Sequence, residues 1–139
     1  MDELFRELFE KISKLESKKN LYKNLNDLTL IEIDTILVIS CDGMKSMSEI
    51  AGKLGVSSGT PTVTIDRLIT KGYVKRIRDA EDRRQVFVKL SDKGQEVFKS
   101  VIELKQRVGQ KLFGILTPEE LQVMIKALSK INSQFSELL

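Results

Sequence analysis

The fold of this chain is decided by residues 46–72, which read SMSEIAGKLGVSSGTPTVTIDRLITKG. Ser46 and Glu49 have the spacing of a capping box, in which each side chain accepts a hydrogen bond from the backbone N–H of the other, so a helix is expected to begin at Met47. An apolar stripe follows at helical spacing, and Gly55 then supplies the permissive backbone that a chain reversal requires. The stretch therefore predicts a short helix followed by a tight turn.

A second helix is predicted after the turn, beginning between Ser58 and Thr60 and running to Lys71. Ser57 and Ser58 offer hydroxyl caps, and Pro61 fits only the first turn of a helix, where its missing N–H would have had no partner. Two helices joined by a short turn containing glycine are typical of the helix-turn-helix arrangement, whose second helix enters the major groove. The same spacing is also compatible with a well-capped helical hairpin that binds nothing.

The outward face of this second helix is suited to a nucleic acid. Gly59 permits close approach to a phosphate backbone, Ser58 and Thr62 offer hydroxyl donors to phosphates or base edges, and Val63 has a methyl surface for thymine. The candidate DNA-binding residues of the helix and its cap are Ser57, Ser58, Gly59, Thr60, Thr62, Val63 and Arg67.

A β-hairpin is predicted after the second helix. Residues 73–78 and 85–90 are rich in β-branched and aromatic side chains, which favours two strands, and the polar connection 79–84 is expected to project into solvent. A paired arginine at the end of a protruding hairpin has the reach to enter a minor groove. The alternative is a solvated turn without a partner. The hairpin adds four candidate DNA-binding residues, namely Arg78, Asp82, Arg83 and Arg84.

A continuous segment that contains this hairpin and runs to Gly94 resembles a known family. It contains DRLITKGYV at residues 66–74, followed by Asp79, Asp82, Arg83, Arg84, Leu90, Ser91 and Gly94. These residues resemble the MarR family of winged helix-turn-helix regulators. The resemblance implies a homodimer in which residues 58–71 read the major groove while Arg84, oriented by Asp82, enters the adjacent minor groove. Many family members carry a basic side chain about where Val63 stands, which implies that hydroxyl, backbone and methyl contacts carry more of the base readout here.

Residues 59–76 further resemble a branch of the family that represses fatty-acid synthesis genes in Gram-positive bacteria. That branch implies an acylated carrier protein as effector, whereas other family members respond to phenolic compounds or oxidants. A small molecule that wedges between the dimer helices and the DNA-binding lobes would change the spacing of the two second helices, and hence DNA affinity.

The charge of the chain is unevenly distributed. Residues 45–93 hold 11 Lys and Arg against 6 Asp and Glu, a net charge of +5, whereas the remainder holds 12 against 14, a net charge of −2. The basic excess therefore coincides with the predicted helix-turn-helix and hairpin, as expected for a DNA-binding surface. Binding that depends on counterion release weakens steeply with salt.

The two ends of the chain are predicted to form amphipathic helices, and Ser91 caps a further helix over residues 92–115. Such stripes have more apolar surface than a compact winged helix covers, so a second subunit is expected to cover them. The candidate dimerisation residues are Leu4, Phe5, Leu8, Phe9, Ile12, Leu121, Met124, Ile125, Leu128, Ile131, Phe135 and Leu138. The expected fold is mainly α with a small β-hairpin wing, a single domain over 1–139. Its DNA-binding lobe spans 29–90, and its helical dimerisation regions span 1–20 and 92–139.

Composition disfavours several classes of function. The chain has no histidine and one cysteine, which excludes histidine-dependent nucleophiles and histidine-based zinc sites. Neither a phosphate-binding glycine loop nor a metal motif is present, so we expect no enzyme, no metal and no cofactor. No stretch approaches the roughly 20 apolar residues of a membrane span, and the N-terminus lacks the build of a secretory signal, so no membrane partner and a cytoplasmic location are expected.

The sequence thus predicts a ligand-responsive repressor that binds a pseudo-palindromic operator as a homodimer. Its predicted partners are double-stranded DNA, a second copy of itself, and a small-molecule or acyl-carrier effector. Two alternatives stay open. One is a winged-helix adaptor between proteins that never touches DNA. The other is a redox sensor on the same fold, triggered by Cys41, although Asp42 beside it opposes a stabilised thiolate and favours a structural role.

Overall fold

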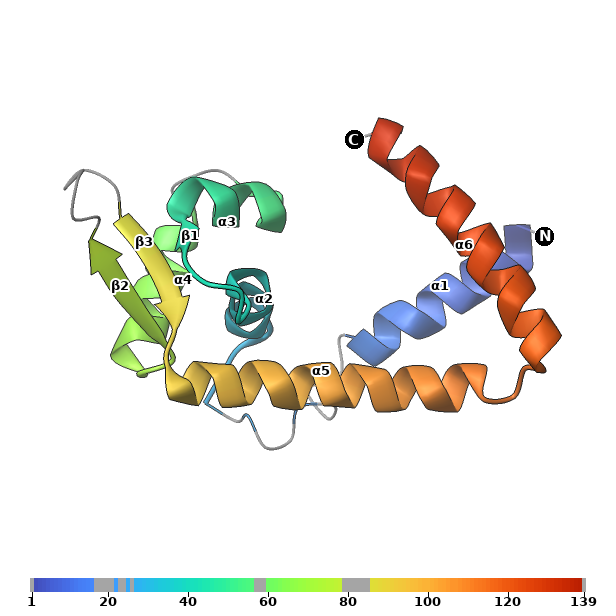
Figure 1. Cartoon of the computed structure of the whole chain (residues 1–139), viewed down its shortest axis with the longest axis horizontal. Coiled ribbons are helices and arrows are strands. Elements are labelled where there is room, and N and C mark those ends of the chain that lie inside the picture. The colour runs from blue at the N-terminus through green and yellow to red at the C-terminus, as the bar shows by residue number, and fades with distance from the viewer. Residues whose placement is uncertain are drawn as a thin grey trace. The chain divides into compact units, whose positions relative to one another are not determined.

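The computed structural model describes residues 2–16, 22, 25, 27–56, 60–78 and 86–138 (Figure 1). Its helices are α1 (Asp2–Glu16), α2 (Leu30–Ile39), α3 (Met47–Leu54), α4 (Thr60–Thr70), α5 (Asp92–Phe113) and α6 (Pro118–Leu138). Its strands are β1 (Lys45–Ser46), β2 (Val74–Arg78) and β3 (Val86–Leu90). The chain divides into two compact units, Met1–Ile102 and Glu103–Leu139. The predicted fold class, mainly α with a small β wing, is confirmed.

Helix starts are set by the predicted capping residues. Ser46 accepts from the backbone N–H of Glu49 at 3.2 Å, and Glu49 accepts from the N–H of Ser46 at 2.7 Å, so α3 begins at Met47 as expected. Thr117 and Glu120 form the same reciprocal pair at the start of α6. These local signals determine where the chain enters each helix.

The end of α4 is fixed by a Schellman motif. Gly72 has a φ of +81°, its N–H donates to Ile69 O at 3.0 Å, and the N–H of Tyr73 donates to Leu68 O at 2.9 Å. The helix proper ends at Thr70, one residue before the predicted end. Likewise, α5 ends at Phe113 instead of residue 115. The chain therefore leaves α4 in a left-handed turn that leads directly into β2.

The sheet has three antiparallel strands in the order β1-β3-β2. Strand β2 pairs with β3 from Val74 opposite Leu90 to Arg78 opposite Val86. The two predicted antiparallel strands are confirmed, except that β2 begins one residue after Tyr73. The predicted connection 79–84 and Gln85, the predicted first residue of the second strand, lie outside the described residues. Strand β1 was not predicted, because two residues show no alternation, yet it pairs with β3 through Lys45 opposite Val88.

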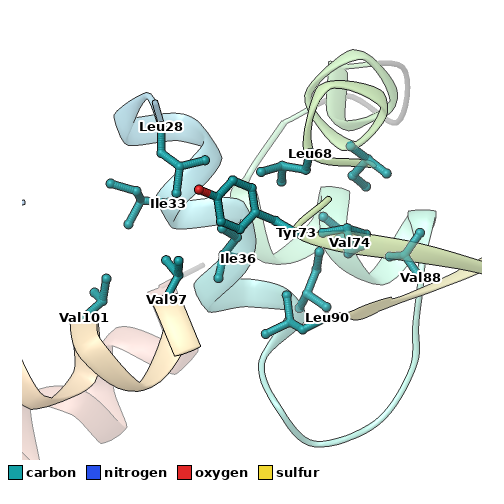
Figure 2. Packing of buried hydrophobic residues seen from close by; sticks show 13 residues of the cluster. Leu28, Ile33, Ile36, Leu68, Tyr73, Val74, Val88, Leu90, Val97 and Val101 are labelled. Atoms are coloured by element: carbon teal, nitrogen blue, oxygen red, sulfur yellow. The ribbon is translucent and has the colours of Figure 1, made fainter. Parts of the chain in front are cut away.

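One hydrophobic core joins α2, α3, α4, the sheet and the start of α5 (Figure 2). The side chains that are fully buried within it include Ile36, Ile39, Ile50, Ile65, Leu68 and Val88. In Figure 2, Val97 and Val101 of α5 approach the same core as Ile33 and Ile36 of α2. This core covers one face of α4 and leaves the opposite face in solvent.

Candidate DNA-binding surface

The outward face of α4 carries the side chains that the sequence placed there. Thr62, Val63, Asp66 and Arg67 are exposed, Val63 with 57% of its surface, while Pro61 is buried on the other face. Thr60 begins the helix. Ser57, Ser58 and Gly59 lie outside the described residues. The described part of α4 therefore presents a hydroxyl, a methyl surface and a guanidinium to a partner.

A shallow hollow of about 330 Å³ runs along α4. It is lined by Val63, Asp66, Arg67, Thr70 and Lys71. An open depression with both apolar and charged walls suits an extended partner better than an enclosed small molecule, which prefers a deep and mostly apolar cavity. The hollow extends the candidate surface toward the C-terminal end of α4.

An ion pair that sequence reasoning missed connects this face to the wing. Arg76 Nη2 of β2 lies 2.6 Å from Oδ1 of Asp66 in α4, and both side chains are about half exposed. An exposed pair adds little to stability, but this one neutralises the acidic residue on the α4 face and holds an arginine beside it. The carboxylate of Asp66 therefore opposes a phosphate near this face less than an unpaired carboxylate would.

The described part of the wing is basic. Arg78 is exposed at the end of β2, and the exposed Lys75 and Lys89 lie directly opposite each other in the β2–β3 ladder. Like charges in opposite positions repel each other, and an anionic partner would relieve this repulsion. Asp82, Arg83 and Arg84 lie outside the described residues, so their contact with a minor groove stays a prediction.

Behind the C-terminal end of α4 lies a polar junction, which we define as Asp27, Glu32, Lys71, Tyr73 and Lys93. Lys71 Nζ lies 2.9 and 2.8 Å from the two carboxylate oxygens of Glu32, and it also donates to the backbone oxygen of Asp27. Burial alone would raise the pKa of Glu32, but hydrogen bonds from Lys71 and Thr29 and the positive charge of Lys71 lower that pKa below its ordinary value.

The tyrosine of the junction is buried and stays neutral. Tyr73 is 4% exposed, and its hydroxyl donates to Oδ2 of Asp27 at 2.7 Å. Burial, followed by this hydrogen bond and the nearby carboxylate charges, raises the pKa of Tyr73 to about 12. The phenol therefore serves as a hydrogen-bond donor throughout the physiological range.

The first turn of α5 completes the junction. Lys93 Nζ lies 4.0 Å from the centroid of the Tyr73 ring and donates to Lys71 O at 3.0 Å. Ser91, which caps α5 as predicted, accepts from Gly94 N at 3.1 Å and donates to Gly72 O at 2.6 Å. The end of α4 and the start of α5 are thus joined by several polar contacts.

The predicted dimerisation stripes are exposed. In α1, exposed fractions run from 41% at Ile12 to 71% at Leu4. In α6, Ile125, Leu128 and Ile131 are 47–50% exposed. Leu121 and Met124 are half-buried, and the side chains of Phe135 and Leu138 lie outside the described ones. Exposed apolar stripes are typical of interaction surfaces, so dimerisation through these residues stays a prediction.

Cys41 is exposed, in the connection between α2 and β1. It lines a hollow of about 70 Å³ together with Ser40, Gly43, Lys89, Leu90 and Gln95. A redox role for this thiol stays a prediction. Among the described residues, no group of three or more carboxylate or thiol side chains is placed to hold a metal ion, and no helix is long and apolar enough to cross a membrane.

Comparison with known proteins identifies the family. The model of the MarR family matches residues 28–86. The multiple antibiotic resistance protein MarR of Escherichia coli is 30% identical over 113 residues, which cover 81% of this chain and 78% of that protein. The chain belongs to the MarR family. The Bacillus subtilis regulator YpoP, an uncharacterized HTH-type transcriptional regulator, is 32% identical over 136 residues, 96% of this chain and 92% of YpoP. The matches to four other B. subtilis regulators cover only 57–66% of the length of each regulator.

A solved structure agrees with the MarR assignment. FabT of Streptococcus pneumoniae, crystallised in complex with DNA, superposes with a TM-score of 0.81 at 25% identity, over 99% of this chain and 96% of FabT. The winged helix-turn-helix fold is therefore confirmed. As a member of the MarR family, the protein is a DNA-binding transcriptional regulator and not an enzyme.

Proposed function

We propose that the protein is a ligand-responsive repressor that binds a pseudo-palindromic operator as a homodimer. The observation that carries this proposal is the uncovered face of α4, where Thr62, Val63 and Arg67 are exposed beside the basic strand β2. Side chains of these kinds contact base edges, thymine methyls and phosphates, while arginines in a wing contact the adjacent minor groove. A DNA complex of FabT, which shares the fold, supports the same mode of binding.

The exposed apolar stripes of α1 and α6 support the homodimer. A twofold dimer presents two copies of α4 to half-sites about one helical turn, roughly 34–36 Å, apart. This geometry supports a palindromic operator, because each subunit reads one half-site.

The regulatory part of the proposal is a change in operator affinity when an effector binds. An effector changes operator affinity only if it binds more tightly to one of two dimer conformations, one in which the spacing of the two α4 helices fits DNA and one in which it does not. The resemblance of residues 59–76 to the fatty-acid branch favours an acylated carrier protein, with a small molecule as the alternative. Titration of an acylated carrier protein into the protein–duplex complex, with the unacylated carrier as control, tests the choice.

The test of DNA recognition begins with selection of bound duplexes from a random pool, followed by sequencing. Arg84→Ala is then compared with wild type on the selected duplex. We expect a loss of affinity of about tenfold or more, with a shallower salt dependence because cation–phosphate contacts are removed. Arg107→Ala, an exposed arginine of α5, is the matched control and should bind normally. A protein that selects no duplex, or an Arg84→Ala variant that binds as wild type does, favours the adaptor instead.

A further inference from the structure

The polar junction contains charges that are costly to bury and that no sequence motif explained. Glu32 is 1% exposed, although the transfer of an isolated carboxylate from water into a protein interior is costly. Its partner Lys71 is 32% exposed by side chain and comes directly after the last residue of α4. Apolar side chains of similar volume often stabilise such a site as well or better. The ion pair is therefore better explained by the geometry that it imposes than by stability.

The ammonium of Lys71 is fully committed inside the junction. It has three donors, and the three acceptors in contact with it are the two carboxylate oxygens of Glu32 and the backbone oxygen of Asp27. Although Lys71 lines the hollow on α4, its charged end is turned toward α2. A phosphate contact would require it to give up these hydrogen bonds, so Lys71 is poorly suited to bind DNA directly.

Lys71 also lies next to the outward face of α4 that carries Thr62, Val63 and Arg67. The backbone N–H of Lys71 donates to Arg67 O at 2.9 Å, so Lys71 follows Arg67 by one helical turn. Its own carbonyl accepts from Lys93 at 3.0 Å. The side chain thus attaches the end of α4 to α2, and the backbone attaches it to α5. A rotation of α4 that moves Arg67 would have to break one of these attachments.

We propose that Glu32 and Lys71 are positioning residues for operator recognition, which hold the C-terminal end of α4 against α2 so that its outward face meets the bases in one orientation. This role rests on the proposed operator binding. Neither residue touches DNA. The pair acts on specificity, because base contacts need a fixed helix orientation whereas phosphate contacts tolerate some change.

Glu32→Gln provides a sharp test. Glutamine keeps the size of the side chain and the capping acceptor, but it removes the charge that binds Lys71. The variant is more positive than wild type, so loss of a phosphate contact does not explain weaker binding. We expect the ratio of affinities for the selected duplex and a scrambled duplex to fall about tenfold or more, while affinity for the scrambled duplex stays equal or rises.

Fluorescence anisotropy at several salt concentrations gives both affinities, at a temperature where each variant is folded by circular dichroism. Glu103→Gln, at an exposed glutamate of α5, is the control for loss of one negative charge and should keep the ratio. If Glu32→Gln does not fold, the double variant Glu32→Gln/Lys71→Met leaves no unpaired buried charge and is expected to show the same loss of selectivity.

The outcomes are distinguishable. A folded Glu32→Gln or double variant that keeps the affinity ratio within about twofold of wild type overturns the positioning role and leaves operator binding intact. A wild-type protein that selects no duplex overturns the proposed function and this role together. Hydrogen exchange gives a readout without DNA, because the amides at the end of α4 should exchange faster in Glu32→Gln. Unchanged exchange there also contradicts the inference.

Discussion

The hydroxyl of Tyr73 donates a 2.7 Å hydrogen bond to the carboxylate of Asp27, a residue 46 positions earlier in the chain. Asp27 lies just before α2, whereas Tyr73 lies between α4 and β2. The contact therefore connects the segment that leads into α2 with the segment that follows α4. Because the Tyr73 ring is buried beneath Lys93, the phenol can ionise only at a cost to the fold.

This arrangement predicts a loss of stability in alkali. The pKa of Tyr73 is raised from 10.0 to about 12 in the folded protein. Folding therefore favours the neutral phenol. The associated stability is fully present below the unfolded pKa and is lost as pH rises through the folded one, a difference of roughly 3 kcal/mol. Absorbance at 295 nm against pH should show one tyrosine that ionises near 12 together with unfolding.

Tyr73→Phe supplies the control for that titration. The variant should be less stable than wild type at neutral pH, by about 1 kcal/mol for a lost hydrogen bond. Because wild type loses more than this as Tyr73 ionises, the difference should shrink and then reverse as pH rises from 10 through 12. If both tyrosines of wild type ionise near pH 10 while the protein stays folded, the buried hydrogen bond is contradicted.

The ionisation of Glu32 should make folding stability depend on pH in the opposite direction, with stability lost as pH falls. Its folded pKa is lowered below the ordinary value of 4.5, so its contribution to stability is present above that value and is lost as pH falls through the folded pKa. Urea unfolding should show Glu32→Gln to be less stable than wild type at pH 7. The gap between the two proteins should narrow in acid. If the difference in free energy of unfolding between the two proteins stays constant from pH 7 down to the lowest pH at which wild type is folded, ionisation of Glu32 is excluded as its cause.

Much of the fold was predictable because its signals are local. The capping box of Ser46 and Glu49, the left-handed Gly72 and the cap at Ser91 each act within a few residues, and the structure has them in place. Amphipathic spacing also assigned the buried and exposed faces of α4 correctly. These features depend on chain geometry that a short stretch of sequence specifies by itself.

What the sequence did not show depends on partners that are distant along the chain. Lys71 and Glu32 are 39 positions apart, and nothing near either residue marks the other. Asp66 and Arg76 face each other only because α4 packs on β2. Strand β1 was missed because two residues form a strand only when β3 is already there to pair with them. Within the candidate surface, sequence reasoning thus predicted which described side chains of α4 are exposed, and it missed the Glu32–Lys71 and Asp66–Arg76 ion pairs.

A larger residue in place of Gly94 is expected to create a packing defect where α5 meets Tyr73. A Cβ at this position would collide with the carbonyl oxygen of Tyr73, which already accepts from Ser91 N at 2.9 Å. Gly94→Ala gains helix propensity but should still destabilise the protein, by about 1–3 kcal/mol for overpacking. Gly52→Ala in α3 meets nothing within 4 Å and should be neutral or stabilising by up to about 1 kcal/mol. Thermal unfolding compares the two, and equal effects would contradict the close approach.

A positive charge in place of Val63 is expected to raise the affinity for DNA of any sequence. Val63 is 57% exposed on the outward face of α4, so Val63→Lys adds a cation there without disturbing the core. Affinity for a scrambled duplex should rise, and the salt dependence should steepen by about 0.9 per subunit. Val123→Lys, 68% exposed in α6, adds the same charge elsewhere and should leave both unchanged. Equal effects of the two variants would show that overall charge, and not the α4 face, governs binding.

The stripes of α1 and α6 predict that charge on either helix separates the dimer. Leu8 and Leu128 are 54% and 48% exposed in the single chain, and burial of a leucine is worth about 1.5–3 kcal/mol, counted twice in a twofold interface. Leu8→Glu and Leu128→Glu should each sediment as a monomer at micromolar concentration, where wild type sediments as a dimer. Lys130→Glu, on the polar side of α6, should remain dimeric. Because each monomer retains only one copy of α4, its operator affinity should fall toward the non-specific value. A glutamate variant that stays dimeric would exclude the stripe that carries it from the dimer interface.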